Sequence, residues 1–412
     1  MELKEYKLGD IAEIVNGSTP TTTCPHYYDG DIVWITPKDL SEQKSKYIEK
    51  GERNITEAGF NSCSTHLIPK YNILLTSRAP IGLLAINKVA CCTNQGFKNL
   101  IVNKDIVDVD YLYYYLKYHI AEIEALGTGT TFKEVSKASM EKYTVSLPDL
   151  EEQKKVSSIL SALDAKISLN RQINQNLEAL ARQLYDYWFV QFDFPNEEGK
   201  PYKSSGGKMV YNPILKREIP EGWEVKNLGT QFDVINERIS PNQLLKDDKY
   251  TPIEIIPRHQ MSLSEYVPLE EATSGLCRYK KGDILLSNRR VYFHKVCIAP
   301  FDGITRDTVI VLRPNETKKI GYLFQVVFSE HFIKFATLNS YGSEQPVLSW
   351  TSAQNYKILI PQNNLDLIYS RKMACIIEQV VANNQQILSL TKQRDELLPL
   401  LMNGQVNFDL LM

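Results

Sequence analysis

The sequence repeats itself at a spacing of about 213–220 residues, close to half of its length of 412 residues. Leu8-Gly9 returns as Leu228-Gly229, segment 72–78 (NILLTSR) returns as 283–289 (DILLSNR), and 143–148 (YTVSLP) returns as 356–361 (YKILIP). Solenoid repeats are much shorter, about 20 to 50 residues. The pattern therefore predicts a duplicated domain with a duplicated helix, and internal pseudo-two-fold symmetry.

The repeat predicts an α+β fold with two globular α/β domains separated by two long helices. We expect the globular domains at 1–148 and 219–362, and the helices at 149–190 and 363–412. Segment 191–218 between them is rich in Gly, Pro, Ser and Lys and has no periodicity, so we expect a loop-like linker there.

Short apolar runs in the first domain predict strands at 31–35 and 71–75, because β-branched residues are flanked there by turn residues. Segment 111–116 (YLYYYL) continues through Ile120 and Ile123 and fits a helix with a buried face. Its tyrosines could stack on nucleic-acid bases, but an apolar helix more often buries them. We expect core tyrosines.

Each long helix carries residues at alternating three- and four-residue steps, the pattern of a coiled-coil seam. The predicted seam residues are Leu163, Asn170, Ile173, Leu177, Leu180 and Leu184 on the first helix, and Ile377, Val380, Asn384, Ile387, Leu398 and Leu401 on the second. A two-fold relation between the copies makes this pair antiparallel within one chain. Asn170 and Asn384 hold equivalent places, where a buried asparagine fixes register.

Net charge, cysteine spacing and hydropathy exclude several classes of protein. The net charge is −2, and the seven cysteines include no CxxC pair, which argues against a disulfide framework and a structural zinc site. The first residues lack the apolar core of a signal peptide, and no apolar run approaches the roughly 18 residues of a membrane span. We expect a soluble cytoplasmic protein without a membrane segment.

Catalytic motifs are missing from the sequence. There is no Asp/Asn-Pro-Pro-aromatic tetrapeptide and no Gly-x-Gly-x-x-Gly. The segment 206–208 (GGK) has Tyr202 where a phosphate loop needs glycine, and 127–131 (GTGTT) lacks a strand-to-helix context. Asp149 with Glu152 reads as helix capping, and the six histidines form no HxH or HExxH motif. We expect no catalytic residue and no metal ligand.

Positive charge gathers between residues 278 and 295, where only Asp283 opposes it. Arginine is the usual reader of guanine in the major groove, and lysine mostly contacts phosphate. The candidate DNA-binding residues are Arg278, Lys280, Lys281, Arg289, Arg290 and Lys295, with Arg78 and Lys98 in the thinner equivalent region of the first domain. Such clusters are often only solvated surface.

Three segments together carry a resemblance to a known family. Segment 219–223 (IPEGW) is followed by Leu228-Gly229, segment 71–75 (YNILL) is followed by 93–96 (TNQG), and 147–153 (LPDLEEQ) runs into a heptad helix. In order, duplication and spacing they resemble the specificity (S) subunit of type I restriction-modification systems, across essentially the whole chain.

The resemblance implies that 1–148 and 219–362 are target recognition domains, each reading one half of a bipartite sequence in double-stranded DNA. The paired helices would set the spacing and dock two methyltransferase (M) subunits, which restriction (R) subunits would join. S-adenosylmethionine, ATP and Mg²⁺ would belong to those partners, and this chain would be non-catalytic. The second helix begins with 361–364 (PQNN) where the first has 148–151 (PDLE), so it lacks the Glu-Gln signature, and equal docking at both ends is in question.

Two alternatives remain open on the sequence. One is a coiled-coil scaffold that does not bind DNA. The other is a fused nuclease or methyltransferase whose motifs are unrecognised.

Overall fold

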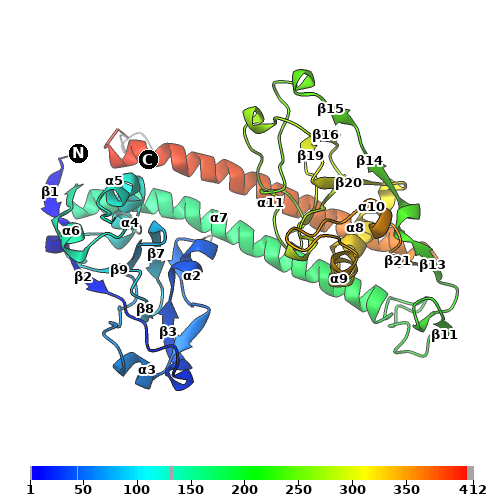
Figure 1. Ribbon diagram of the computed structural model, residues 1–412, viewed down its shortest axis with the longest axis horizontal. Helices are drawn as coiled ribbons and strands as arrows, with labels where there is room; N and C mark the ends of the chain where they lie inside the picture. The colour runs from blue at the N-terminus through cyan, green and yellow to red at the C-terminus, as the bar shows by residue number, and fades with distance from the viewer. Residues whose placement is uncertain (1, 44, 130–132, 406–412) are drawn as a thin grey trace. The chain divides into compact units, whose positions relative to one another are not determined.

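The computed structural model describes residues 2–43, 45–129 and 133–405. The chain divides into two units (Figure 1): unit 1 comprises Met1–Ser168 with Leu390–Met412, and unit 2 comprises Leu169–Ser389. Helix α7 (Leu150–Tyr185) and helix α11 (Leu365–Met402) each contribute residues to both units. The predicted α+β class, with two mixed domains and two long helices, is confirmed.

Unit 1 is built around a five-stranded sheet of order β2-β9-β6-β7-β4, in which only the short β4 runs parallel to its neighbour β7. A three-stranded sheet β5-β3-β8 and the pair β1-β10 complete it. The strands are β1 Lys4–Lys7, β2 Ala12–Asn16, β3 Tyr28–Ile35, β4 Tyr47–Ile48, β5 Arg53–Ile55, β6 Ile73–Ser77, β7 Ile81–Asn87, β8 Cys91–Thr93, β9 Lys98–Val102 and β10 Thr144–Leu147. The predicted strands at 31–35 and 71–75 correspond to β3 and β6.

The helices of unit 1 pack their apolar residues into the core beside this sheet. They are α1 Leu8–Ile11, α2 Pro37–Glu42, α3 Glu57–Asn61, α4 Val109–Tyr118, α5 Ile120–Ala125 and α6 Lys137–Lys142, with the 3-10 turn η1 Pro25–Tyr27. Helix α4 begins where Asp108 accepts a hydrogen bond from the main-chain N–H of Tyr111. Four of its five tyrosines, at 111 and 113–115, are buried, which confirms the prediction of core tyrosines, and Tyr118 at its end is 36% exposed.

Unit 2 repeats this topology. Its four-stranded sheet has the order β14-β20-β17-β18, which matches β2-β9-β6-β7 strand for strand, and β13-β21 matches β1-β10. The strands are β11 Met209–Asn212, β12 Arg217–Pro220, β13 Glu224–Asn227, β14 Phe232–Ile235, β15 Arg238–Ile239, β16 Leu276–Tyr279, β17 Ile284–Ser287, β18 Val296–Ile298, β19 Gly303–Arg306, β20 Val309–Pro314 and β21 Lys357–Ile360.

The remaining helices of unit 2 follow the same order as those of unit 1. They are α8 Ile320–Phe328, α9 Glu330–Leu338 and α10 Trp350–Ala353, with the 3-10 turns η3 Leu228–Gln231, η4 Pro241–Gln243, η5 Leu269–Glu271, η6 Val291–Phe293 and η7 Thr317–Lys319. Helices α8 and α9 therefore correspond to α4 and α5. Among the described residues, no helix combines the length and apolar character that a membrane crossing requires.

The prediction that 191–218 is only loop is wrong. Helix α7 continues into a π-helical turn, η2 (Asp186–Val190), and β11 and β12 then form an antiparallel hairpin. Phe192 is buried beside Trp223, and their ring centroids lie 5.5 Å apart. This aromatic contact holds the start of the segment, and hydrophobic periodicity does not reveal such a contact.

The two long helices run antiparallel in unit 1. Arg394 of α11 donates a hydrogen bond to Asp164 of α7, with 2.8 Å between Nη1 and Oδ1. Closer to the start of α7, Leu160 belongs to the same buried cluster as Leu398 and Leu401. Lower numbers on α7 thus meet higher numbers on α11.

The same sense holds in unit 2. The side-chain amide of Asn170 donates to Oε1 of Gln386 (2.7 Å), and the Tyr369 hydroxyl donates to the carbonyl of Ala181 (3.0 Å). The two contacts fix an antiparallel pair, as the duplication predicts.

The seam of α7 differs from the predicted one after Asn170. Leu180 is 53% exposed, whereas Asn174, Glu178 and Ala181 of α7 and Trp188 of η2 are buried. Asn174, Glu178 and Ala181 each lie one position beyond a predicted seam residue, namely Ile173, Leu177 and Leu180. The prediction of Leu180 followed its apolar character and is wrong, because the helix buries the adjacent Ala181 and leaves Leu180 exposed. Leu163, Ile173, Leu177 and Leu184 are partly buried.

The seam of α11 includes the predicted residues Val380, Asn384, Ile387, Leu398 and Leu401, which are all buried, and Ile377, which packs against the core of unit 2. Counted from Pro148 and Pro361, a spacing of 213 residues, the counterpart of Asn170 is Asn383 and not Asn384. Asn174 contacts both asparagines, donating to Asn384 (2.8 Å) and accepting from Asn383 (2.7 Å).

Candidate nucleic-acid interface

Each unit joins the end of a central strand to a loop that follows its helix pair. In unit 1 the main-chain N–H of Val135 donates to the carbonyl of Ser77, which ends β6 (3.0 Å). In unit 2 the N–H of Leu348 donates to the carbonyl of Asn288, which follows β17 (2.8 Å). Val135 and Leu348 are 213 residues apart, so the contact is part of the duplication.

The loops themselves are closed in the same way. Thr128 and Glu134 exchange two main-chain hydrogen bonds of 3.0 Å each, and Tyr341 and Val347 exchange bonds of 3.0 and 2.8 Å. We call residues 78–80 and 288–295 the first and second turns, and we call the segments that contain these pairs the first and second loops. Glu134 and Val347 therefore occupy equivalent positions. The described part of the first loop ends at Gly129 and resumes at Lys133.

The second turn presents two exposed arginines, Arg289 and Arg290. A β-bridge pairs Arg289 with Val347, and the N–H of Arg290 donates to the carbonyl of Pro346 (2.9 Å). Arg290 has φ of 46°, a left-handed conformation that is uncommon for a residue with a side chain. Within the described residues, neither guanidinium lies in an ion pair. Both charges are therefore available to an anionic partner.

The first turn holds its positive charge differently. Nη1 of Arg78 lies 3.6 Å from Glu134, and Nζ of Lys98 lies 3.0 Å from the same carboxylate. Lys98 is only 7% exposed and lies 3.4 Å from the Ser77 hydroxyl. The Lys98 ammonium group is therefore held in a buried ion pair, and its contact with DNA stays a prediction. Arg78 remains half-exposed.

The cations at 278–295 do not form one patch. Two guanidinium nitrogens of Arg278 donate hydrogen bonds to the Asp248 carboxylate (2.9 and 3.2 Å). Nζ of Lys295 donates to the carbonyls of Ile253 (2.6 Å) and Glu254 (3.0 Å). These contacts tie both side chains to other segments of unit 2, and their contact with DNA stays a prediction.

Lys280 and Lys281 are exposed, but they precede β17 whereas Arg289 and Arg290 follow it. The lysine pair and the second turn therefore lie at opposite ends of β17.

A buried carboxylate attaches the globular part of unit 2 to the helices. The N–H of Met261 donates to Oε1 of Glu178 on α7 (2.7 Å), and the Asn384 amide of α11 lies 3.4 and 3.3 Å from the carbonyls of Ser262 and Leu263. Burial raises the pKa of Glu178 to about 7, although the Met261 hydrogen bond opposes the shift.

In unit 1, a buried ammonium group attaches the globular part to α7. Nζ of Lys46 donates to Asp110 of α4 (2.6 Å), to the Tyr114 hydroxyl (3.1 Å) and to Ser161 of α7 (2.7 Å). Lys46 is itself buried. Neither anchor was identified from the sequence, because a lone Lys or Glu in a polar stretch gives no sign of its burial.

The Glu-Gln signature at the start of α7 has a structural role. Gln153 is buried, accepts from the N–H of Asp108 (2.9 Å) and donates to the carbonyl of Pro148 (2.9 Å). Its counterpart Asp366, 213 residues on, is buried and lies 3.3 Å from Lys319. The two helix starts are thus tied to their domains by different polar contacts at the same position.

The described part of the chain therefore combines a duplicated sheet, a duplicated turn–loop contact and two antiparallel helices. A family model of the type I restriction modification DNA specificity domain matches residues 1–179 and 220–393, which is one match for each copy. The chain belongs to the type I restriction-modification specificity family.

Relatives along nearly the full length agree with this assignment. The type I restriction enzyme MjaIX specificity subunit of Methanocaldococcus jannaschii is 32% identical over 420 aligned residues, covering 98% of this chain and 93% of that protein. The HindI specificity subunit of Haemophilus influenzae is 23% identical and covers 98% and 99%. The S subunit of a type I restriction-modification system from M. genitalium has the same fold, with a TM-score of 0.54, 15% identity, and coverage of 97% of this chain and 96% of that one.

Proposed function

We propose that this specificity subunit reads a bipartite sequence in double-stranded DNA, one half with each unit. The observation that carries the proposal is the duplicated turn–loop contact, which has the same main-chain hydrogen bond in both units and different side chains around it. A common frame with unlike side chains suits two unlike half-sites.

Arg289 and Arg290 are the residues to which we assign DNA contact in unit 2, and Arg78 is the one in unit 1. Arginine can bind guanine O6 and N7 through two hydrogen bonds or bind phosphate. Lys280 and Lys281 are proposed as a second, separate contact to the phosphate backbone. The unneutralised arginine pair favours this function over that of a scaffold without DNA.

We further propose that α7 and α11 set the distance between the half-sites and dock two methyltransferase subunits, with restriction subunits joining the assembly. The catalytic chemistry, with S-adenosylmethionine, ATP and Mg²⁺, belongs to those partners in this scheme. The antiparallel pairing within each unit supports it, since each helix then offers an equivalent end to a partner.

The test is to express the chain with its methyltransferase subunit in a host without DNA methylation and to sequence the modified adenines. We expect a split motif with a spacer of fixed length, and no modification when this chain is omitted. A continuous motif, or modification without this chain, would contradict the proposal.

A paired deletion tests the role of the helices. Removing residues 165–171 of α7 together with 387–393 of α11 takes one heptad from each helix and leaves the Asp164–Arg394 contact in place. Seven residues span about 10.5 Å of helix, so we expect the spacer to shorten by about three base pairs. Deleting 165–171 alone is the control, and it should break the register and abolish methylation. A motif with an unchanged spacer after the paired deletion would remove the helices from this role.

A further inference from the structure

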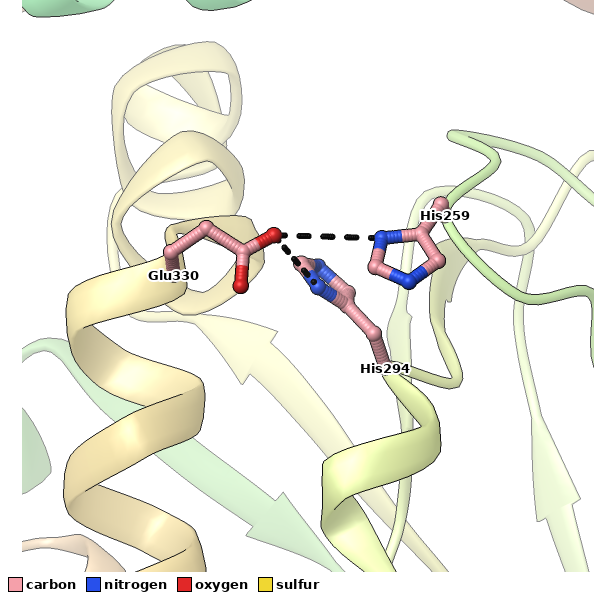
Figure 2. A group of neighbouring side chains, drawn as sticks. All are labelled: His259, His294 and Glu330. Atoms are coloured by element: carbon pink, nitrogen blue, oxygen red, sulfur yellow. Dashed lines mark ion pairs between the residues drawn. The ribbon is translucent and has the colours of Figure 1, made fainter. Parts of the chain in front are cut away.

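Three side chains from separate segments of unit 2 point toward one another (Figure 2): His259 in a loop, His294 directly after η6, and Glu330 at the start of α9. Oε1 of Glu330 lies 3.2 Å from Nδ1 of His294 and 3.8 Å from Nδ1 of His259. The three potential ligand atoms all lie within 4.8 Å of one another. The proposed DNA contacts do not include any of them.

His294 lacks the partners that a buried ring normally has. It is 2% exposed, and neither ring nitrogen makes a hydrogen bond of normal geometry, although Glu330 and the backbone of Phe328 lie close by. Buried polar atoms are nearly always satisfied, so an orphaned imidazole calls for an explanation such as an ion.

The main chain brings the two rings together. The N–H of His259 donates to the carbonyl of His294 (3.1 Å), and the ring centroids are 4.3 Å apart. Both residues have φ of 53°, in the left-handed region that residues with side chains seldom adopt. Such conformations cluster at ligand sites.

We propose that His259, His294 and Glu330 bind a divalent transition-metal ion, for which Zn²⁺ is the probe. Two imidazoles and one carboxylate with an open fourth position form an established zinc ligand set. Metal–ligand bonds of about 2.0–2.1 Å in a tetrahedron place neighbouring ligand atoms about 3.3 Å apart. The observed 3.2 and 3.8 Å are close to this separation, so small side-chain rotations complete the site.

Burial and the neighbouring His259 both lower the pKa of the His294 ring. The positive charge of Arg182 also lowers this pKa, and the Glu330 carboxylate raises it. The side chains of His259 and Glu330 are 54% and 64% exposed, which leaves an entry path for the ion.

In unit 1 the positions that match His294 and Glu330 hold no such ligands. Leu75 pairs with Leu84, and Leu286 pairs with Val296, which aligns Gly82 with His294. The first residue of α5 is Ile120, where α9 has Glu330, and a side chain at Gly82 would meet Ile120 at 2.8 Å. The metal site is thus a property of unit 2.

An ion at this site would join the second turn, which contains His294, to α9 and to the loop that contacts Glu178 and Asn384. The experiment uses the full chain, stripped with a chelator and titrated with Zn²⁺ by calorimetry and by competition with a chromogenic chelator. We expect one Zn²⁺ per chain with Kd of about 1 µM or lower, and a tetrahedral absorption spectrum when Co²⁺ replaces Zn²⁺.

Variants His259→Ala and His294→Ala should each weaken binding at least about tenfold, and His66→Ala, an exposed histidine of unit 1, should leave it unchanged. The exposed His259 keeps the test informative if the buried His294 variant does not fold. Absence of binding below about 100 µM overturns the site. So does unchanged stoichiometry and affinity in His259→Ala.

Discussion

The first and second turns share a frame and differ in charge. In the first turn, Glu134 lies beside Arg78 and Lys98 and neutralises much of their charge. In the second turn, the equivalent residue is Val347, and Arg289 and Arg290 stay free of ion pairs within the described residues. Duplication thus preserves the main-chain contact, while the equivalent loop position is acidic in unit 1 and apolar in unit 2.

The anchors of the two globular parts differ as well. Unit 1 attaches through the buried ammonium group of Lys46, and unit 2 attaches through the buried carboxylate of Glu178. The same architecture therefore tolerates opposite charges at its attachment points, provided that each buried charge is hydrogen-bonded.

The largest effect should come from the anchor of unit 1. Lys46→Met removes the ammonium group and leaves Asp110 without its ion-pair partner. Breaking such a buried pair costs about 3 to 5 kcal/mol, so we expect a drop of this order in the free energy of unfolding of unit 1. Denaturant unfolding of the full chain measures it, with Lys50→Met, an exposed lysine nearby in sequence, as the control. A loss below about 1 kcal/mol would contradict the role of Lys46.

The anchor of unit 2 should make its stability depend on pH. The pKa of Glu178 rises from 4.5 to about 7 on folding, so the folded state binds the proton more tightly. Stability from this group is complete below pH 4.5 and is lost as pH rises through about 7. The difference corresponds to at most about 3 kcal/mol.

Glu178→Gln keeps an acceptor for Met261 and removes the titration. We expect the variant to be more stable than the parent at pH 8 and equal to it near pH 4.5, as measured by denaturant midpoints. Glu265→Gln, at an exposed position nearby, should follow the parent at both pH values. Parallel curves for Glu178→Gln and the parent would show that its carboxyl group is not perturbed.

Charge reversal separates the two turns. Arg289→Glu with Arg290→Glu should weaken DNA binding by the complex about 100-fold, equivalent to about 2.7 kcal/mol, because two free cations are replaced by anions. Arg78→Glu should cost less, since Glu134 already neutralises Arg78. Filter binding across a salt series checks both, and Lys318→Glu at an exposed site of unit 2 is the control. Equal losses at the two turns would remove the proposed difference.

A glutamate introduced into the second loop tests the same difference in charge between the two turns. Val347→Glu places a carboxylate beside Arg289, as Glu134 lies beside Arg78, and we expect DNA binding to weaken about tenfold. Val347→Thr, with nearly the same shape, should bind like the parent. If the glutamate variant also binds like the parent, Arg289 does not act through its charge.

The helices and their antiparallel sense could be predicted from the sequence, because heptad spacing and duplication are visible in one chain. The tyrosine core of α4 was also predictable from its apolar neighbours. The seam of α7 was misplaced at Leu180, because an apolar side chain was preferred to the register that buries Ala181.

The site was less predictable. Lys98 and Lys295 were predicted as DNA contacts from their charge alone. Their partners lie far away in sequence: Lys98 contacts Glu134, and Lys295 contacts the carbonyls of Ile253 and Glu254. The histidine pair was missed for the same reason, since His259 and His294 meet only through the fold. Local motifs cannot report contacts that tertiary structure creates.

The central claim is that each unit reads one half of the target. It is tested most directly by a variant chain in which a second copy of residues 1–164 replaces residues 221–377. This variant then contains the globular domain of unit 1 and the start of α7 twice. Each copy includes the anchor residues Lys46, Ser161 and Asp164. Sequencing the adenines methylated by its complex should reveal an inverted repeat built from one original half-site, with the original spacer. A motif that keeps its two unlike halves would contradict the account.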